Sequence, residues 1–181
     1  NEKNLEVILV SSGAVGAGYT TLKLDKKIIA NKQALAAIGQ PLLLKHYKKR
    51  FKEHNISCAQ MLFIADDFDS RKRTKNAQDV MEILLENKIL PIINENDVIA
   101  NYELLFGDND QLAAHVAFHF KADMLAILSD IDGYYNKNPR EFDDAVLQKE
   151  VSFIDPSELQ MTHTANSEFA TGGIVTKLKA A

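Results

Sequence analysis

Short apolar runs alternate along this chain with longer segments whose apolar residues recur at helical spacing. The apolar runs are continuous, as in strands covered on both faces, and they span residues 5–10, 57–64, 89–93 and 124–128. Helical spacing predicts helices at residues 31–38, 42–54, 71–86 and 111–120. Strands that alternate with helices predict an α/β fold, here a three-layer αβα sandwich with a mainly parallel central sheet.

Breaks and caps refine these elements. The sequence Gly-Gln-Pro at 39–41 separates the first two helices, because proline suits the first turn of a new helix. Residues 66–70 offer capping groups for the third helix, whose expected buried residues are Ala77, Val80, Met81, Leu84 and Leu85. Leu112, Ala113, Val116 and Ala117 are expected to be buried in the fourth. A hairpin is predicted at 98–106, a short strand at 151–154 and a helix after 173.

Polar or glycine-rich loops follow the predicted strands directly. Their sequences are SSGAVGAG (11–18), NEND (94–97) and SDIDG (129–133), and a second polar cluster, FGDND (106–110), follows the NEND loop. Each loop alone is compatible with a solvated turn. Right-handed crossovers, however, place the carboxyl ends of parallel strands along one sheet edge. We therefore expect the loops to converge on one ligand site, with residues 98–106 as a candidate lid.

Composition narrows the class of protein. The 181 residues carry a net charge of −4, so bulk electrostatics gives no support for a nucleic-acid partner. No apolar segment approaches the ~20 residues that span a bilayer, so no membrane association is expected. Cys58 is the only cysteine and is expected to pack as a small hydrophobe. A cytoplasmic protein without disulfides fits best.

The groups in these loops suit phosphate chemistry. Glycine-rich loops let a backbone approach a ligand closely, and N–H groups at a helix start bind anions. Lys177 lies close to Gly172 and Gly173 and could neutralise developing charge. Three carboxylates could bear on Mg²⁺ or hold lysines in place: Asp108, Asp110 and Asp130.

Other chemistries are less well supported. His115 and His119 lie four residues apart, which is metal-ligand spacing, but no third ligand is evident and no metal site is expected. No Ser-His-Asp order or Cys-His pair can be assembled. Phosphoryl transfer needs mainly positioning and charge stabilisation. A carboxylate acceptor would need no catalytic base, because its ordinary pKa of ~4.3 leaves it ionised at neutral pH.

Six segments are most informative when they are taken together. They are VSSGAVGAG (10–18), KQALAAIGQP (32–41), PIINEND (91–97), FGDNDQLAA (106–114), SDIDGYYNKNPRE (129–141) and TGGIVTKLKAA (171–181). With them the chain resembles the glutamate 5-kinase family of the amino acid kinase superfamily, in which PIINEND followed by GDND is specific to that family. The resemblance implies phosphorylation of the L-glutamate γ-carboxylate by ATP with Mg²⁺, giving L-glutamyl 5-phosphate in proline biosynthesis.

The resemblance also implies roles for the substrate loops. Glutamate would be bound by Ser12, Gly13, Asp97 and Asn109. This agrees with the chemistry of the groups, since an α-ammonium is bound by a carboxylate and an α-carboxylate by hydroxyl and amide donors. Asp108 would lie close to the substrate.

The nucleotide would be contacted by a separate set of residues. By resemblance these are Ser129, Asp130, Thr171, Gly172, Gly173, Ile174, Val175, Thr176 and Lys177. Lys177 would neutralise charge on the transferring phosphoryl group, and Asp110 would orient this lysine. We therefore expect catalytic roles for Lys177, Asp110 and Asp108.

Some family features are absent. The family's first strand, which carries a second phosphate-binding lysine, has no counterpart, nor has the C-terminal part of the nucleotide lobe. We therefore expect a partial domain, with residues 1–120 mainly in the glutamate lobe and 121–181 beginning the nucleotide lobe. Ala170 stands where the family has glycine. A homo-oligomer, either dimer or tetramer, is expected.

Two alternatives stay open. One is another amino acid kinase, acting on N-acetylglutamate, aspartate or carbamate. The other is a non-catalytic relative that binds a ligand or nucleic acid through the basic runs at 45–52 and 71–75.

Overall fold

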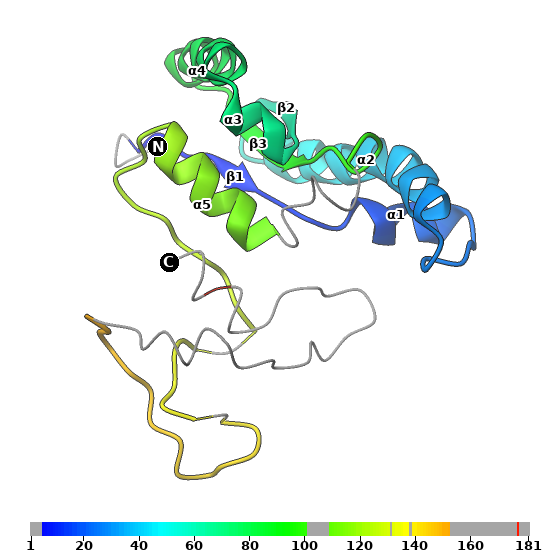
Figure 1. The fold of residues 1–181 in the computed structure, drawn as a ribbon. Coiled ribbons are helices and arrows are strands. Elements are labelled where there is room, and N and C mark those ends of the chain that lie inside the picture. The colour runs from blue at the N-terminus through cyan, green and yellow to red at the C-terminus, as the bar shows by residue number, and fades with distance from the viewer. Residues whose placement is uncertain (1–4, 101–108, 131, 138, 153–176, 178–181) are drawn as a thin grey trace.

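The computed structural model describes residues 5–100, 109–130, 132–137, 139–152 and 177, and Figure 1 shows how its elements are arranged. The elements in chain order are β1 (Leu9–Val10), α1 (Ala14–Thr21), α2 (Ile29–Lys52), β2 (Cys58–Phe63), α3 (Ala65–Asp69), α4 (Arg71–Glu86), β3 (Leu90–Glu95) and α5 (Asn109–His119). Among the described residues, no helix combines the length and the apolar character that a membrane span requires.

The three strands form one parallel sheet in the order β1-β3-β2. β3 pairs with β1 through Leu9↔Ile92 and Val10↔Ile93, and with β2 along its whole length from Cys58↔Leu90 to Phe63↔Glu95. Its central position explains why β3 is buried from Pro91 to Glu95. The expected parallel sheet of an α/β fold is confirmed.

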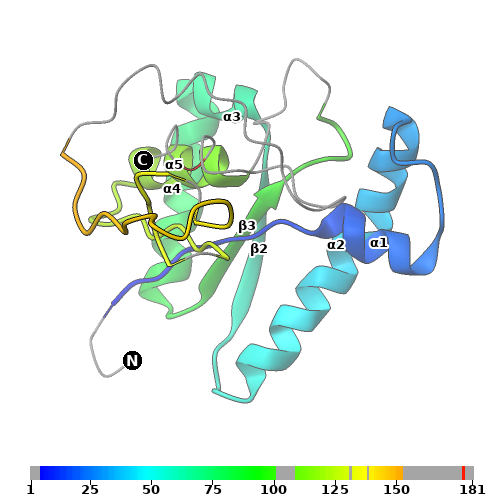
Figure 2. The ribbon, with the colours of Figure 1, turned by 90° about the horizontal axis from the view of Figure 1, so that it is seen from below.

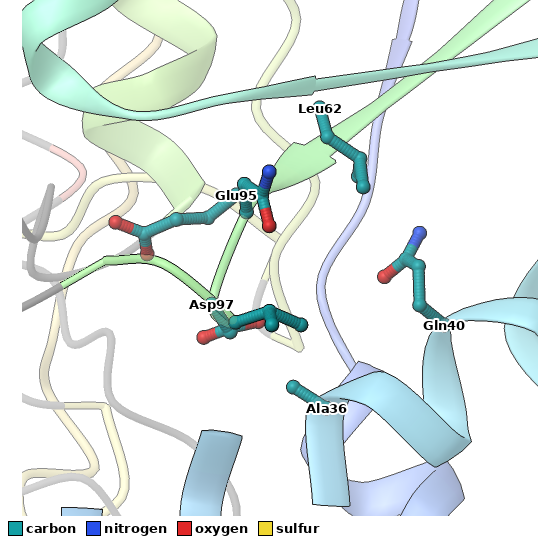
Figure 3. A pocket seen from close by; sticks show the side chains of 7 residues that line it. Ala36, Gln40, Leu62, Glu95 and Asp97 are labelled. Atoms are coloured by element: carbon teal, nitrogen blue, oxygen red, sulfur yellow. The ribbon is translucent and has the colours of Figure 1, made fainter. Parts of the chain in front are cut away.

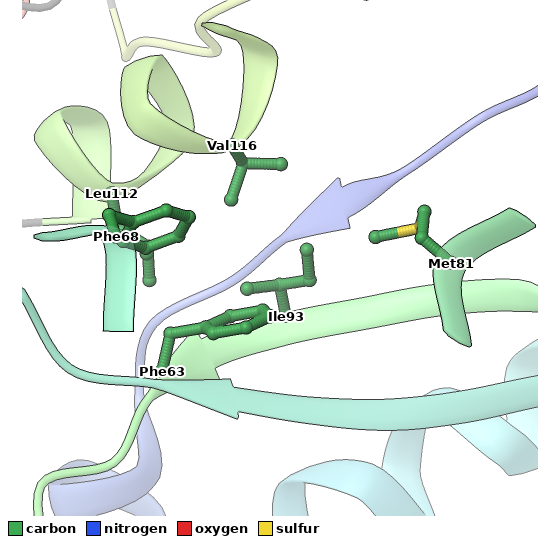
Figure 4. Close-up of a cluster of buried hydrophobic side chains, with 6 residues drawn as sticks. All are labelled: Phe63, Phe68, Met81, Ile93, Leu112 and Val116. Carbon is green, nitrogen blue, oxygen red and sulfur yellow. The ribbon is translucent and has the colours of Figure 1, made fainter. Parts of the chain in front are cut away.

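Different helices cover the two faces of the sheet. Figure 2 shows α4 and α5 on one side of the strands and α2 on the other. The face toward α4 and α5 carries the main hydrophobic core, which Figure 4 shows from close by: Phe63, Phe68, Met81, Ile93, Leu112 and Val116. Burial of Met81, Leu112 and Val116 was predicted from helical spacing and is confirmed, whereas Val80 is 47% exposed.

The cap predicted before α4 is present. The Ser70 hydroxyl accepts a hydrogen bond from the backbone N–H of Arg73 at 3.4 Å. The preceding residues form the short helix α3, and the Asp67 carboxylate accepts from the N–H of Ile64 at 2.8 Å.

The predicted break at residues 39–41 is wrong, because α2 runs unbroken through Pro41. Close packing against α1 explains why this helix continues. A Cβ atom added at Gly39 would lie 1.7 Å from the carbonyl oxygen of Ala14, and one at Gly18 would lie 1.9 Å from that of Leu35. Pro41 removes one helical hydrogen bond to the carbonyl of Ala37, but both residues are exposed and water can solvate that carbonyl.

Two predicted strands need correction. The first begins only at Leu9. The register places Leu90, where β3 starts, opposite Val7, so Leu5 (65% exposed) lies beyond the end of its partner. Residues 124–128 form no strand, and Met124 and Leu128 are 81% and 85% exposed. An apolar run becomes a strand only where a neighbour supplies hydrogen bonds, and none of the described strands pairs with it.

The other predicted elements lie largely outside the described residues. Residues 97–99 form a turn, in which the N–H groups of Ile99 and Ala100 donate to the Asn96 carbonyl, so the start of the predicted hairpin is not a strand. The rest of that hairpin, and the candidate lid with it, lies outside the described residues. So does most of the strand predicted at 151–154, whose first two residues are not in a strand.

Candidate functional site

The carboxyl ends of β1 and β3 meet the start of α5 in a network of side-chain amides. The Asn109 amino group, in the first turn of α5, donates to the carbonyl oxygen of Ser11 at 2.5 Å and to Oδ1 of Asn94 at 2.7 Å. Ser11 follows β1 directly, and its own N–H donates to the carbonyl of Ile93 at 2.8 Å. Two of the predicted loops and the FGDND cluster therefore converge at this edge.

Asn94 is the centre of this network. It is only 3% exposed, at the end of the central strand. Its Oδ1 accepts from the backbone N–H of Glu95 at 2.8 Å as well as from Asn109, and its amino group donates to Oε1 of Gln40 at 2.8 Å. The Asn94 side chain is too buried to form these hydrogen bonds with water instead. Loss of any one of them would therefore cost free energy of folding.

Helix α2 contributes a second contact to the strand ends. The Ser11 hydroxyl lies 2.8 Å from the Tyr47 hydroxyl and donates its single proton to the Ser12 carbonyl at 3.0 Å. Tyr47 is therefore the donor of the pair. Gln40 and Tyr47 lie seven residues apart, about two helical turns, and so face the same side of α2.

A small open pocket adjoins this network (Figure 3). Its lining residues are Ala36, Gln40, Leu62, Glu95, Asn96, Asp97 and Val98. Burial raises the pKa of the Asp97 carboxyl, and the positive charge of nearby Lys32 partly opposes that rise. The half-buried Asp97 carboxylate, which lines a partly apolar pocket, suits a cationic group such as an ammonium.

The first glycine loop has a more structural role than its composition suggested. Gly13 has φ = 107° and precedes α1, so it is the one glycine of this loop that requires left-handed backbone. Gly18 serves the close crossing with α2. Ser12 and Gly13 are exposed at the start of α1, where free N–H groups are suited to an anion.

A half-buried ion pair lies at the start of α5. Lys177 Nζ is 2.9 Å from the Asp110 carboxylate, and the two side chains are 22% and 19% exposed. A single aspartate in the first helical turn thus holds a lysine from the far end of the chain. The expected pairing of Asp110 with Lys177 is present.

The loop after residue 128 supplies a second carboxylate. Asp130 is exposed and forms an ion pair with Arg140 at 2.5 Å. A hydrogen bond from Arg140, together with its positive charge and that of Lys177, lowers the pKa of Asp130. Ser129 is exposed beside it.

The remaining predicted site residues are Asp108, Thr171, Gly172, Gly173, Ile174, Val175 and Thr176, and they lie outside the described residues. Sequence reasoning assigned no role to Gln40, Tyr47 or Asn94. Asn94 lies in the NEND loop that was expected at the site, and Gln40 lies in the segment KQALAAIGQP, where its neighbours were interpreted as a helix break.

No group of three or more potential metal ligands occurs within the described part of the chain. His115 and His119 stack on each other at a centroid distance of 6.0 Å, and His119 lies 4.9 Å from the Phe68 ring. Asp110 and Asp130 are each paired with a cation. Asp110 and Asp130 therefore each hold a basic side chain, one of the two roles that the sequence left open.

Comparisons with known proteins agree with this geometry. The amino acid kinase family pattern matches residues 1–181. Among the similar proteins are the glutamate 5-kinases of Wolinella succinogenes, 58% identical, and of Helicobacter hepaticus, 54% identical, with 99% and 97% of this chain aligned. The glutamate 5-kinase of Oceanobacillus iheyensis is 46% identical over the whole chain. The chain spans 70%, 67% and 49% of these three relatives. The chain belongs to the amino acid kinase family.

Proposed function

We propose that the protein is a glutamate 5-kinase, which transfers the γ-phosphoryl group of ATP to the γ-carboxylate of L-glutamate in cytoplasmic proline biosynthesis. The observation that carries the proposal is the adjacency, at the start of α5, of two different half-sites. Asn109 joins the amide network beside the Asp97 pocket, and the next residue, Asp110, holds Lys177. One helix start thus lies between a site for an amino acid and a lysine for phosphate.

The chemistry needs little beyond these groups. A γ-carboxylate oxygen attacks the γ-phosphorus, the bond to the β,γ-bridging oxygen breaks, and ADP leaves with the electron pair of that bond. No proton is transferred, so the reaction requires no catalytic base. Lys177, held in place by Asp110, would neutralise charge on the transferring group.

The proposal includes Mg²⁺ and two regions of the chain that bind different substrates. Mg²⁺ is usually held by substrate phosphates and water with one or two carboxylates, so a full protein cage is not required. Bound to the phosphates, the ion would reduce their charge. Residues 1–120 would mainly bind glutamate and residues 121–181 would begin the nucleotide lobe. Ser129 and Asp130 are proposed nucleotide contacts, and a homo-oligomer is proposed.

The test is a coupled assay of the full-length protein with glutamate, ATP and Mg²⁺, in which hydroxylamine traps the acyl phosphate. Lys177→Ala should lower kcat on the order of 10²-fold or more, as losses of preorganised charge stabilisers do. Lys137→Ala is the matched control, because Lys137 also pairs with an aspartate, Asp144, but on an exposed loop. A near-normal kcat for Lys177→Ala would contradict the assigned role.

Substrate choice separates the alternatives. N-acetylglutamate lacks the free ammonium that Asp97 is proposed to bind and should be a poor substrate. Preferred turnover of N-acetylglutamate, aspartate or carbamate would identify another amino acid kinase. Salt-sensitive nucleic-acid binding without ATP turnover would instead favour the non-catalytic relative.

A further inference from the structure

The amide network assigns a specific polarity to Asn109. The Ser11 carbonyl can only accept, so the Asn109 group beside it must be the amino group. The Glu95 N–H can only donate, so the Asn94 atom beside it must be Oδ1, and this oxygen also faces Asn109. Both assignments depend on backbone groups, which cannot be reversed by turning an amide through 180°.

Both protons of the Asn109 amino group are therefore engaged, and Oδ1 is the side-chain atom that remains for a ligand. The sequence-based expectation that amide donors bind the substrate carboxylate does not fit this residue. An oxygen acceptor suits a donor group, and the donor of an amino acid is its ammonium. Asn109 and Asp97 would then both bind the cationic end of the substrate.

We propose that Gln40 is a positioning residue of this site, which holds Asn94 so that Asn94 in turn holds the Asn109 amide with its oxygen toward the substrate ammonium. This inference rests on the proposed function. Gln40 Oε1 is the acceptor for the Asn94 amino group, at 2.8 Å. Asn94 is almost completely buried, so its amino group has no access to bulk water as a replacement.

The position of Gln40 in α2 makes it suitable for this task. The preceding residue, Gly39, lies in close backbone contact with α1, which holds this turn of the helix in place. Gln40 also lines the pocket with Asp97 (Figure 3). Helix packing, rather than a flexible loop, thus determines where Oε1 lies, and a site built on a packed helix is held more precisely.

Gln40→Met keeps the length and approximate volume of the side chain but removes the acceptor. In the full-length protein we expect a rise in KM for glutamate on the order of 10-fold, the equivalent of one buried hydrogen bond. KM for ATP should change by less than about 2-fold, because Gln40 lines the pocket proposed for glutamate and not the lysine site proposed for phosphate. Gln78→Met is the control: Gln78 also makes a hydrogen bond to a partner far along the chain, here as the donor to the His119 carbonyl at 2.8 Å, but on the other face of the sheet.

A double-mutant cycle separates positioning from a general loss of stability. If Gln40 acts through Asn109, Gln40→Met should change KM for glutamate by less than about 2-fold in an Asn109→Ala background. An equal effect in both backgrounds, an unchanged KM in the single variant, or parallel rises for glutamate and ATP would each overturn the inference.

A measurement that needs no turnover tests the hydrogen bond from Asn94 to Gln40 separately from the proposed function. Hydrogen exchange of side-chain amides, followed by NMR, should show protected Asn94 amino protons in the wild type and fast exchange in Gln40→Met. Unprotected Asn94 protons in the wild type would overturn the inference whatever the substrate. A wild-type protein that shows this protection but does not phosphorylate glutamate would contradict the proposed function alone.

Discussion

The direction of the Asn109 amide leads to an unusual prediction. The isosteric variant Asn109→Asp should be less stable, and should have a higher KM for glutamate, than the truncated variant Asn109→Ala. Asn109→Asp preserves the shape of the side chain and provides a negative charge that could attract the substrate ammonium. On these grounds alone, the variant would be expected to bind glutamate well. The structure opposes it, because the new carboxylate oxygen would lie where an amino group now donates to the Ser11 carbonyl and to Asn94 Oδ1, at 2.5 and 2.7 Å. Two hydrogen bonds would become contacts between acceptors.

Magnitudes decide between the opposing effects. Each lost hydrogen bond costs ~1 kcal/mol, and a buried acceptor left without a donor costs ~1–3 kcal/mol more. A carboxylate in the first turn of α5 recovers only ~0.3–1 kcal/mol from the helix dipole. Asn109→Ala loses the same hydrogen bonds but adds no charge. We therefore expect Asn109→Asp to be less stable than Asn109→Ala by ~1–2 kcal/mol, with the higher KM for glutamate.

Urea unfolding of both variants measures the difference, and the glutamate kinase assay measures the KM values. Asn136→Asp is the control, since Asn136 uses its Oδ1 to accept from the N–H of Val146 at 2.9 Å and aspartate can do the same. That variant should be close to wild type. If Asn109→Asp proved as stable as Asn109→Ala or bound glutamate more tightly, the assigned polarity would be wrong.

Three further outcomes are expected. The half-buried Asp97 carboxyl has a raised pKa, so its ionised form opposes folding above the unfolded-state pKa. Asp97→Asn should therefore not lower the melting temperature at pH 7 but should raise KM for glutamate. In the wild type, glutamate binding should weaken as pH falls through that raised pKa. Gly39→Ala places a Cβ 1.7 Å from the Ala14 carbonyl and should lower the unfolding free energy by ~3 kcal/mol or more, or prevent folding, as thermal unfolding would show. Tyr47→Phe removes the proton donated to the Ser11 hydroxyl and should raise KM for glutamate several-fold at a stability cost of ~1 kcal/mol; an unchanged KM would show that Tyr47 does not support the site.

Local sequence pattern was sufficient to predict an element where the tertiary contacts of the segment agree with its intrinsic secondary-structure preference. β2 and β3 are short apolar runs at the predicted places, Ser70 caps α4, and the buried residues of α5 follow its helical spacing. The alternation of these elements also predicted the parallel sheet, and with it the meeting of the loops at one edge. These features follow from periodicity and capping, which are properties of neighbouring residues.

Tertiary contacts decided the rest. A Gly-Gln-Pro sequence normally ends a helix, but the crossing of α1 over Gly39 stabilises α2 through Pro41. The run at 124–128 has a strand's composition but no described partner strand. The direction of the Asn109 amide depends on the Ser11 carbonyl, 98 residues away along the chain, and on the Asn94 side chain, 15 residues away. The N–H of Glu95 in turn determines the direction of the Asn94 amide.

The sequence by itself thus determined the fold class, the family and the loops that carry the chemistry, because these are written in residue type and spacing. Only the tertiary structure decided that Gln40 and Tyr47 of α2 hold the strand ends, and that Asn109 offers an acceptor. The physical reason is that a hydrogen bond's direction depends on the partner, and Tyr47, Gln40 and Asn109 each have a partner that is distant along the chain.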